Sequence, residues 1–98
     1  MKSIMQEEKC CYVCGRTTWL EEHHVFEGIA NRKLSEKYGL KIYLCHKHHN
    51  EVPDGIHFDK WLRDRIKQEA EKRFIEYYNS SIEEFIKIFG KNFLEVKV

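Results

Sequence analysis

The sequence predicts an α+β fold in which a first half with short strands precedes a second half made of helices. Two observations support this prediction. Every Cys and His of the 98-residue chain lies before Phe58. The residues after Phe58 contain no Cys, His or Pro and have a helical spacing of apolar side chains. With 42% apolar residues, the chain has the size of one domain, residues 1–98, without room for a second independent core.

Two pairs of cysteine and histidine residues in the first half have short, regular spacings. Cys11 and Cys14 form a CxxC knuckle, and Cys45 and His48 form a CxxH pair. Since thiols stay reduced in the cytoplasm, these spacings indicate metal binding rather than disulfides. They predict a structural Zn²⁺ site with three Cys ligands and one His ligand. Cys10 is an alternative to Cys11, but Cys11 has the better spacing to Cys14.

Thirty residues, 15–44, separate the two pairs, more than the roughly 15–20 of a simple zinc ribbon. Residues 20–26 and 41–44 in this insert are typical of strands. The first of these segments contains His23 and His24, and neighbours along a strand point to opposite faces. One imidazole is therefore free to bind a metal ion while the other faces a substrate.

Apolar residues at i+4 steps predict a long amphipathic helix after residue 58. The stripe consists of Phe58, Leu62, Ile66, Ala70, Phe74 and Tyr78, widened by Trp61, Ile75 and Tyr77. We assign it to the core. Asn79 and Ser80 interrupt the helix, and Ser81 begins a capping box for a short second helix that ends at Gly90. Residues 93–98 alternate as an edge strand or an ordered tail would.

The first half resembles the zinc-stabilised HNH endonucleases, also called ββα-metal or His-Me finger nucleases. The resemblance rests on the CxxC knuckle, the His pair ending a strand, and Leu-Cys-x-x-His-His. More narrowly, the segment HHVFEGIANRKLSEKYGLKIYLCHKHHN followed by GIHF is similar to small HNH proteins of phages and prophages. The resemblance implies a zinc-stabilised ββα-metal core at residues 8–58 and a helical extension at residues 59–98. We expect a cytoplasmic protein of a bacterium or phage-infected cell.

The resemblance also implies a metal-dependent DNA endonuclease that hydrolyses phosphodiester bonds. His24 matches the general base, and His23 and His49 match the ligands of one catalytic divalent ion. His57 is a candidate third ligand, with DNA contact or packing at a helix start as the alternatives. The chemistry is consistent, because a neutral imidazole accepts a proton from water at about pH 7 and a divalent ion offsets phosphate charge. Mg²⁺, Mn²⁺, Ni²⁺ and Zn²⁺ all remain candidates for the ion.

One residue of the family motif is displaced. The middle Asn of HNH usually lies about five residues before the second knuckle, where this chain has Leu40. Asn31 is the best substitute, and its alternative role is that of a turn or helix-cap residue. Residues 28–50 contain five basic residues and one acidic residue. Among the basic residues, we expect Arg32 and Lys33 to bind substrate phosphates, the alternative being a solvated helix face.

The overall charge restricts the partners that the sequence predicts. With 17 basic and 16 acidic residues the net charge is +1, which argues against binding by bulk charge alone. No apolar run has the length of a membrane helix. We expect double-stranded DNA as the partner, and no membrane. A homodimer is a further expectation, because it would place one site on each strand of the DNA. The alternative function is an inactive, zinc-stabilised module that binds DNA or protein.

Overall fold

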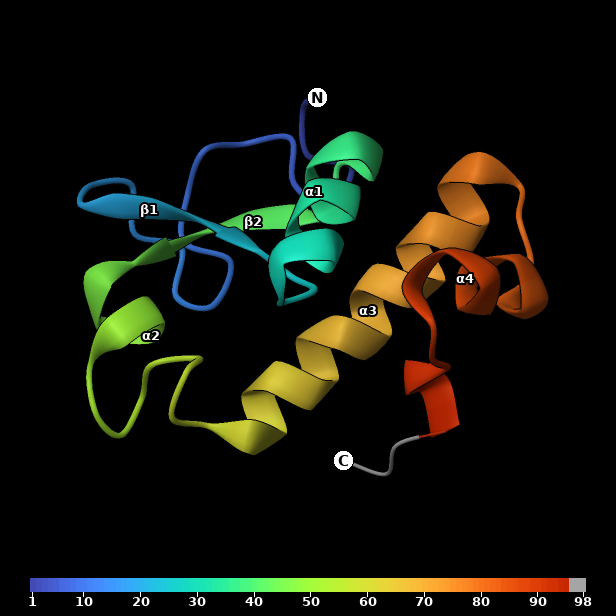
Figure 1. Cartoon of the computed structure of the whole chain (residues 1–98). Helices are drawn as coiled ribbons and strands as arrows, with labels where there is room; N and C mark the ends of the chain where they lie inside the picture. The colour runs from blue at the N-terminus through green and yellow to red at the C-terminus, as the bar shows by residue number, and fades with distance from the viewer. Residues whose placement is uncertain (96–98) are drawn as a thin grey trace.

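A computed structural model describes residues 1–95 and confirms the α+β fold (Figure 1). Two strands pair antiparallel, β1 (Leu20–His24) and β2 (Lys41–Cys45), and their connection carries helix α1 (Ile29–Tyr38). The remaining elements are the short helix α2 (His46–Asn50), the long helix α3 (Lys60–Tyr78), helix α4 (Ile82–Phe89) and a 3-10 helix at Phe93–Glu95. Figure 1 shows the sheet and α2 in one part of the molecule and α4 beside α3 in the other.

The register of the sheet places the two adjacent histidines on opposite faces. His23 pairs with Ile42, and His24 pairs with Lys41. His23 is 5% exposed, whereas the side chain of His24 is 19% exposed. The alternation expected of a strand therefore directs one imidazole into the interior and leaves the other on a more open face.

Helix α1 is fixed against the end of β1 by a buried serine. The hydroxyl of Ser35 accepts a hydrogen bond from the Phe26 amide at 3.2 Å and lies 3.3 Å from the Phe26 carbonyl oxygen, to which it donates. The Val25 amide donates to the Leu40 carbonyl at 3.0 Å, which ties the start of the connection to its end. The residues of α1 are thereby held beside His24.

The buried apolar side chains form one cluster that draws on both halves of the chain. Helices α3 and α4 contribute Ile66, Ala70, Phe74, Phe85 and Phe89, and the sheet region contributes Val25, Phe26, Leu40, Ile42 and Leu44. Ring contacts join the two groups, with the centroid of Phe26 5.4 Å from that of Phe85 and 4.8 Å from that of Phe89. Among residues 1–95, no helix is both long and apolar enough to cross a membrane.

Three residues that the sequence assigns to the buried stripe are exposed. Phe58 and Trp61 are each 55% exposed, and Tyr77 is 51% exposed. Phe58 lies outside the helix because Asp59 caps α3 by accepting from the Leu62 amide. The Trp61 and Tyr77 rings are instead covered in part by the guanidinium groups of Arg65 and Arg73, at 5.7 and 5.5 Å from the ring centroids. The assignment of these three residues to the core is therefore wrong.

The C-terminal segment is a 3-10 helix at Phe93–Glu95 rather than an edge strand. The Phe93 amide donates to Glu71 Oε1 at 2.7 Å, and its ring centroid lies 4.9 Å from that of Phe26. These contacts fold the segment back onto α3, away from strand pairing. The rest of the predicted strand, residues 96–98, lies outside the described residues.

Replacing Ser81 with alanine is expected to lower the free energy of unfolding by about 1 kcal/mol. The Ser81 hydroxyl accepts from the Glu84 amide at 3.2 Å and so caps α4, as the sequence predicts. Chemical denaturation measures the change. Ser80→Ala is a matched control, because the Ser80 hydroxyl donates to the exposed Glu84 carboxylate rather than satisfying a backbone amide. Equal losses from the two substitutions would contradict the capping role.

Candidate metal centres

Four predicted ligands converge on one point. The donor atoms of Cys11, Cys14, Cys45 and His48 all lie within 4.8 Å of one another. The distance from Cys14 Sγ to Cys45 Sγ is 3.8 Å, and His48 Nδ1 lies 3.2 Å from Cys45 Sγ. Ligand atoms about 2.0–2.3 Å from a tetrahedral Zn²⁺ would be about 3.4–3.8 Å apart. The cluster is consistent with a structural zinc site. Cys10 is not part of it.

Backbone hydrogen bonds bring the two halves of this cluster together. The Cys11 amide donates to the Arg16 carbonyl at 2.7 Å, and the Gly15 amide donates to the Cys11 carbonyl at 2.8 Å. Gly15 has a φ of +78°, which a residue without Cβ adopts readily. The Tyr12 amide donates to the Tyr43 carbonyl at 2.8 Å. Since Tyr43 lies on β2, this bond sets the knuckle beside the strand that ends at Cys45.

The pKa values of two thiols in the cluster are shifted in opposite directions. Burial raises the pKa of Cys11, but hydrogen bonds with the backbone of Cys45, Cys14 and Val13 outweigh it and lower the pKa to about 6. Burial raises the pKa of Cys45, and the neighbouring thiols of Cys11 and Cys14 raise it further. Repulsion among several thiolates is the arrangement that a bound dication relieves.

A second cluster consists of three histidines. The donor atoms of His23, His49 and His57 lie within 4.8 Å of one another, and their ring centroids are 4.9–5.5 Å apart. The structure thus brings the candidate third ligand, His57, to the two ligands that the resemblance implies. His23 Nε2 is buried and has no hydrogen-bond partner among residues 1–95. Leaving such a nitrogen unpaired costs about 1–3 kcal/mol, which ligation of a metal ion would offset.

The environment of His23 keeps its imidazole neutral. Burial, followed by the neighbouring charges of His49 and His57, lowers the pKa of His23 to about 3. A neutral imidazole is the form that binds a metal ion. The three-histidine cluster therefore fits a divalent ion.

Close packing and hydrogen bonds in the loop after α2 fix the position of His57. A Cβ on Gly55 would lie 2.8 Å from the Glu51 carbonyl oxygen and 3.0 Å from that of His49, so this close approach requires glycine. The Ile56 amide donates to the His48 carbonyl at 2.8 Å. From α3, Arg63 Nη1 donates to the carbonyls of Ile56 and His57, each at 3.2 Å. His57 is thus held from both α2 and α3.

Glu21 orients His49 rather than His23. From β1, Glu21 Oε1 lies 2.7 Å from His49 Nδ1 and accepts from Asn50 Nδ2 at 2.7 Å, while Oε2 lies 3.0 Å from His46 Nδ1. Hydrogen bonds with His46 and His49 lower the pKa of Glu21, which stays ionised. When Nδ1 of His49 donates to this carboxylate, Nε2 is left to bind a metal ion.

Replacing Glu21 with glutamine is expected to weaken metal binding at the three-histidine cluster by about 10–100-fold, because the carboxylate fixes the tautomer of His49. Titration of the zinc-loaded protein with Ni²⁺ measures the affinity. Glu51→Gln is the control, since the Glu51 carboxylate lies 4.0 Å from the exposed His46 and contacts no histidine of the cluster. Equal affinity in the wild type and Glu21→Gln would contradict this role.

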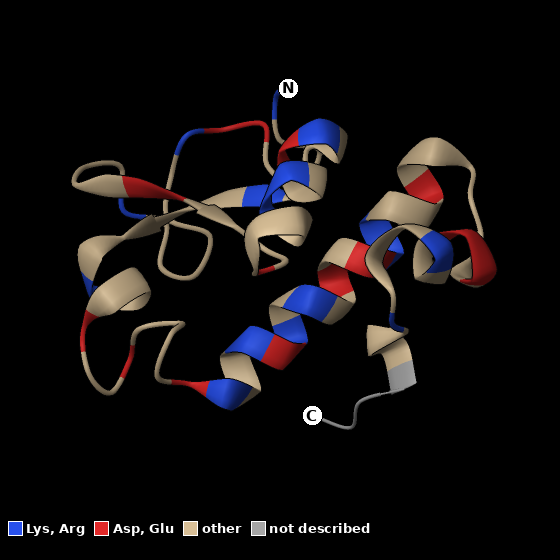
Figure 2. Cartoon of the chain, viewed as in Figure 1, with Lys and Arg blue, Asp and Glu red and all other residues tan. Residues whose placement is uncertain are grey.

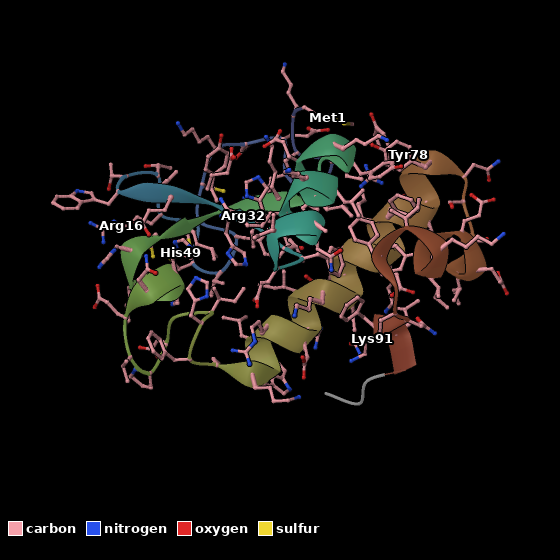
Figure 3. The ribbon with its side chains drawn as sticks, in the orientation of Figure 1. Met1, Arg16, Arg32, His49, Tyr78 and Lys91 are labelled. Atoms are coloured by element: carbon pink, nitrogen blue, oxygen red, sulfur yellow. The ribbon has the colours of Figure 1, made fainter. Side chains whose placement is uncertain are left out.

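An open cleft of about 280 Å³ gives access to the three-histidine cluster. It is lined by Glu22, His23, His24, Glu27, Arg32, His49 and His57. A neighbouring hollow of about 450 Å³ is lined by His24, Ile29, Arg32, Lys33 and Glu36. His24 and Arg32 line both. Figure 3 shows the side chains of Arg32 on α1 and His49 on α2, and Figure 2 shows Lys and Arg on α1 and on α3.

The other predicted site residues lie on α1. Asn31 is half-buried, and within residues 1–95 its side chain makes no hydrogen bond, so its catalytic role stays a prediction. Arg32 and Lys33 are exposed, and their role in phosphate binding also stays a prediction. The residue in contact with His24 is Glu36, whose Oε1 lies 3.1 Å from His24 Nε2. In the sequence, Glu36 is distinguished merely as the single acidic residue of the basic segment at residues 28–50.

Comparison with protein-family models finds no match, and searches of curated proteins and of solved structures find none either.

Proposed function

We propose that this chain is an HNH-type, metal-dependent endonuclease that hydrolyses phosphodiester bonds in double-stranded DNA. The observation that carries the proposal is the cleft that His24 and Arg32 share with the three-histidine cluster. It combines a proton acceptor, a metal site and a cation for the phosphate, which are the groups that phosphodiester hydrolysis requires. The resemblance of the motifs to the HNH endonucleases supports the same roles.

The histidines and basic residues that line the cleft and the neighbouring hollow have separate roles. A divalent ion held by His23, His49 and His57 would offset negative charge on the phosphate oxygens. His24 accepts the proton of the attacking water, through the ring nitrogen that does not face Glu36. Arg32 binds a nonbridging phosphate oxygen. Lys33, in the neighbouring hollow, contacts the next phosphate of the strand. Asn31 takes the catalytic place of the middle Asn of the motif.

Zinc bound at the cluster of Cys11, Cys14, Cys45 and His48 would fix the position of a ligand of the three-histidine cluster. Cys45 ends β2, and His48 is followed directly by His49. Zinc bound to Cys45 and His48 would therefore fix the first turn of α2 and, with it, the ligand at His49. With four protein ligands, such a site has no open position and is structural.

The composition of the three-histidine cluster bears on the identity of its ion. Its three ligand candidates are imidazoles, whereas Mg²⁺ prefers carboxylate and water oxygens. Imidazole ligands suit Zn²⁺ and Ni²⁺. Among the four candidate ions, we therefore expect Ni²⁺ or Zn²⁺ to bind more tightly than Mg²⁺.

Plasmid cleavage tests the proposal. The purified chain, with its zinc content measured, is incubated with supercoiled plasmid and with a single-stranded oligonucleotide in Mg²⁺, Mn²⁺, Ni²⁺ or Zn²⁺. We expect cleavage of the plasmid with at least one ion, and a loss of cleavage in a His23→Ala, His57→Ala double variant. If the folded, zinc-loaded wild type cuts neither substrate with any ion, the nuclease proposal is wrong and a DNA- or protein-binding module replaces it.

A further inference from the structure

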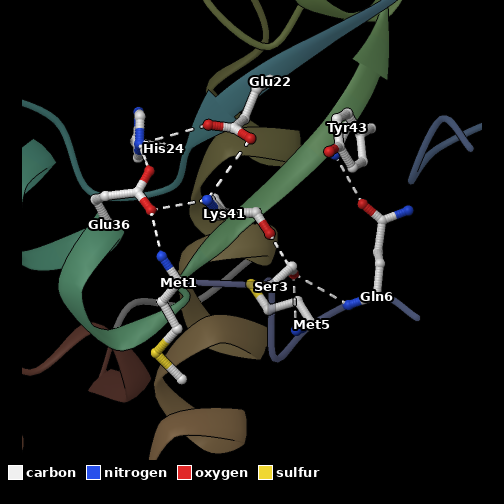
Figure 4. A network of polar contacts seen from close by, with 9 residues as sticks. All are labelled: Met1, Ser3, Met5, Gln6, Glu22, His24, Glu36, Lys41 and Tyr43. Carbon is white, nitrogen blue, oxygen red and sulfur yellow. Dashed lines mark hydrogen bonds and ion pairs between the residues drawn. The ribbon is translucent and has the colours of Figure 1, made fainter. Parts of the chain in front are cut away.

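The contacts of Glu36 connect α1 to both strands at His24 (Figure 4). One carboxylate oxygen, Oε1, lies 3.1 Å from His24 Nε2. The other, Oε2, accepts from Lys41 Nζ at 2.8 Å and from the amino group of Met1 at 2.9 Å. The two oxygens are thus divided between the imidazole and the two cations. Because Lys41 is largely buried and anchors Oε2, the carboxylate is held in place with Oε1 turned toward His24.

The other charged groups around His24 do not share this geometry. Glu22 Oε1, on the same strand, lies 3.9 Å from His24 Nε2, which is too long for a hydrogen bond. Glu22 Oε2 lies 3.7 Å from Lys41 Nζ. Arg32 lines the cleft with His24 from α1. Among residues 1–95, Glu36 is the one side chain within hydrogen-bond distance of the His24 imidazole.

We propose that Glu36 is the positioning residue of the general base: it accepts the Nε2–H hydrogen bond of neutral His24 and thereby leaves the lone pair on Nδ1 as the proton acceptor. This inference rests on the proposed nuclease function. A carboxylate on one ring nitrogen fixes both the tautomer and the orientation of the ring.

The environment keeps Glu36 in the form that accepts a hydrogen bond. Hydrogen bonds from Lys41, and then from His24 and the amino group of Met1, lower the pKa of Glu36 to about 2. Its side chain is 42% exposed, so it is not part of the core. Removal of its carboxylate should therefore change the imidazole more than the fold.

A matched pair of substitutions separates positioning from a purely structural ion pair. Glu36→Ala removes the carboxylate that contacts His24, and Glu76→Ala removes an exposed carboxylate that pairs with Arg73 outside the cleft. The readouts are kcat and KM for a short duplex substrate, the melting temperature, and the nitrogen-15 chemical shifts of the His24 ring in the zinc-loaded full chain. The shifts report which nitrogen carries the proton, whether or not the chain cuts DNA.

For Glu36→Ala we expect kcat to fall about 10–100-fold, with KM changed less than about twofold, because orientation of the base rather than substrate binding is lost. The wild-type shifts should report a proton on Nε2, and Glu36→Ala should show a mixture of both tautomers. Glu76→Ala should keep the wild-type kcat and tautomer. The inference is wrong if Glu36→Ala keeps both the wild-type kcat and the wild-type tautomer of His24, or if the two variants lose kcat equally. If wild type does not cut DNA at all, the nuclease proposal fails, and the ring shifts still decide whether Glu36 fixes the tautomer.

Discussion

Replacing His24 with alanine is expected to slow DNA cleavage by about 10²–10⁴-fold, which is the contribution of a positioned general base. Of the four histidines that line the cleft, His24 is the one outside the three-histidine cluster. It points to the opposite face of β1 from His23, so its removal leaves the metal ligands in place. Single-turnover cleavage rates, measured with the ion that best supports the wild type, give the size of the effect.

The contrast between His24 and its neighbour makes this prediction specific. His24→Ala should keep its zinc content and bind DNA within about twofold of the wild type, and more metal should not restore its rate. His23→Ala should lose metal affinity, and a higher concentration of the same ion should restore part of its rate. A His24→Ala protein that cuts at the wild-type rate would show that the attacking water is activated by another group.

The features that the sequence predicted well depend on short spacings. The Ser81 cap of α4, the left-handed residue Gly90 and the alternation of His23 and His24 are set by residues within one turn or one strand. The second half of the predicted capping box is not formed, because the Glu84 carboxylate accepts from the Ser80 hydroxyl. The two ligand pairs are also local, and β2 joins them through the Tyr12 amide. Such patterns constrain the backbone directly, and apart from this half of the capping box the structure keeps all of them.

The orienting contacts could not be predicted, because they depend on the placement of elements far apart along the chain. Glu36 reaches His24 across 12 residues, and Glu21 reaches His49 across 28. Each contact requires the direction of a helix relative to the sheet, which no local pattern encodes. The sequence therefore indicates which side chains carry the chemistry, but not which carboxylates hold them.

The exposed aromatic residues show a related limit of periodicity. An i+4 stripe identifies one face of a helix, but it does not say how much of that face is covered. The middle of the α3 stripe, at Ile66, Ala70 and Phe74, is buried. Trp61 and Tyr77, near the two ends of α3, are about half exposed. Their packing depends on where the neighbouring elements stop.

Removing one ligand of the candidate zinc cluster, which consists of Cys11, Cys14, Cys45 and His48, is expected to unfold the sheet region. Structural zinc contributes about 10–16 kcal/mol of apparent binding free energy, which is comparable to or larger than the 5–15 kcal/mol stability of a typical domain. Cys45 is the most informative target, because it is buried and joins β2 to α2. Cys45→Ser should lose its zinc and the cooperative part of its thermal unfolding, as measured by metal analysis and circular dichroism.

Cys10→Ser is the matched control for this variant. Cys10 is next to Cys11 in sequence, but its thiol lies outside the zinc cluster and accepts from Gln6 Nε2 at 3.8 Å. It should keep one zinc per chain and the wild-type melting temperature. Because His49 follows the candidate zinc ligand His48, Cys45→Ser should also lose Ni²⁺ binding at the three-histidine cluster, while Cys10→Ser retains it. A Cys45→Ser protein that melts at the wild-type temperature and still binds Ni²⁺ would mean that the core alone holds α2 in place and that zinc is dispensable for the second site.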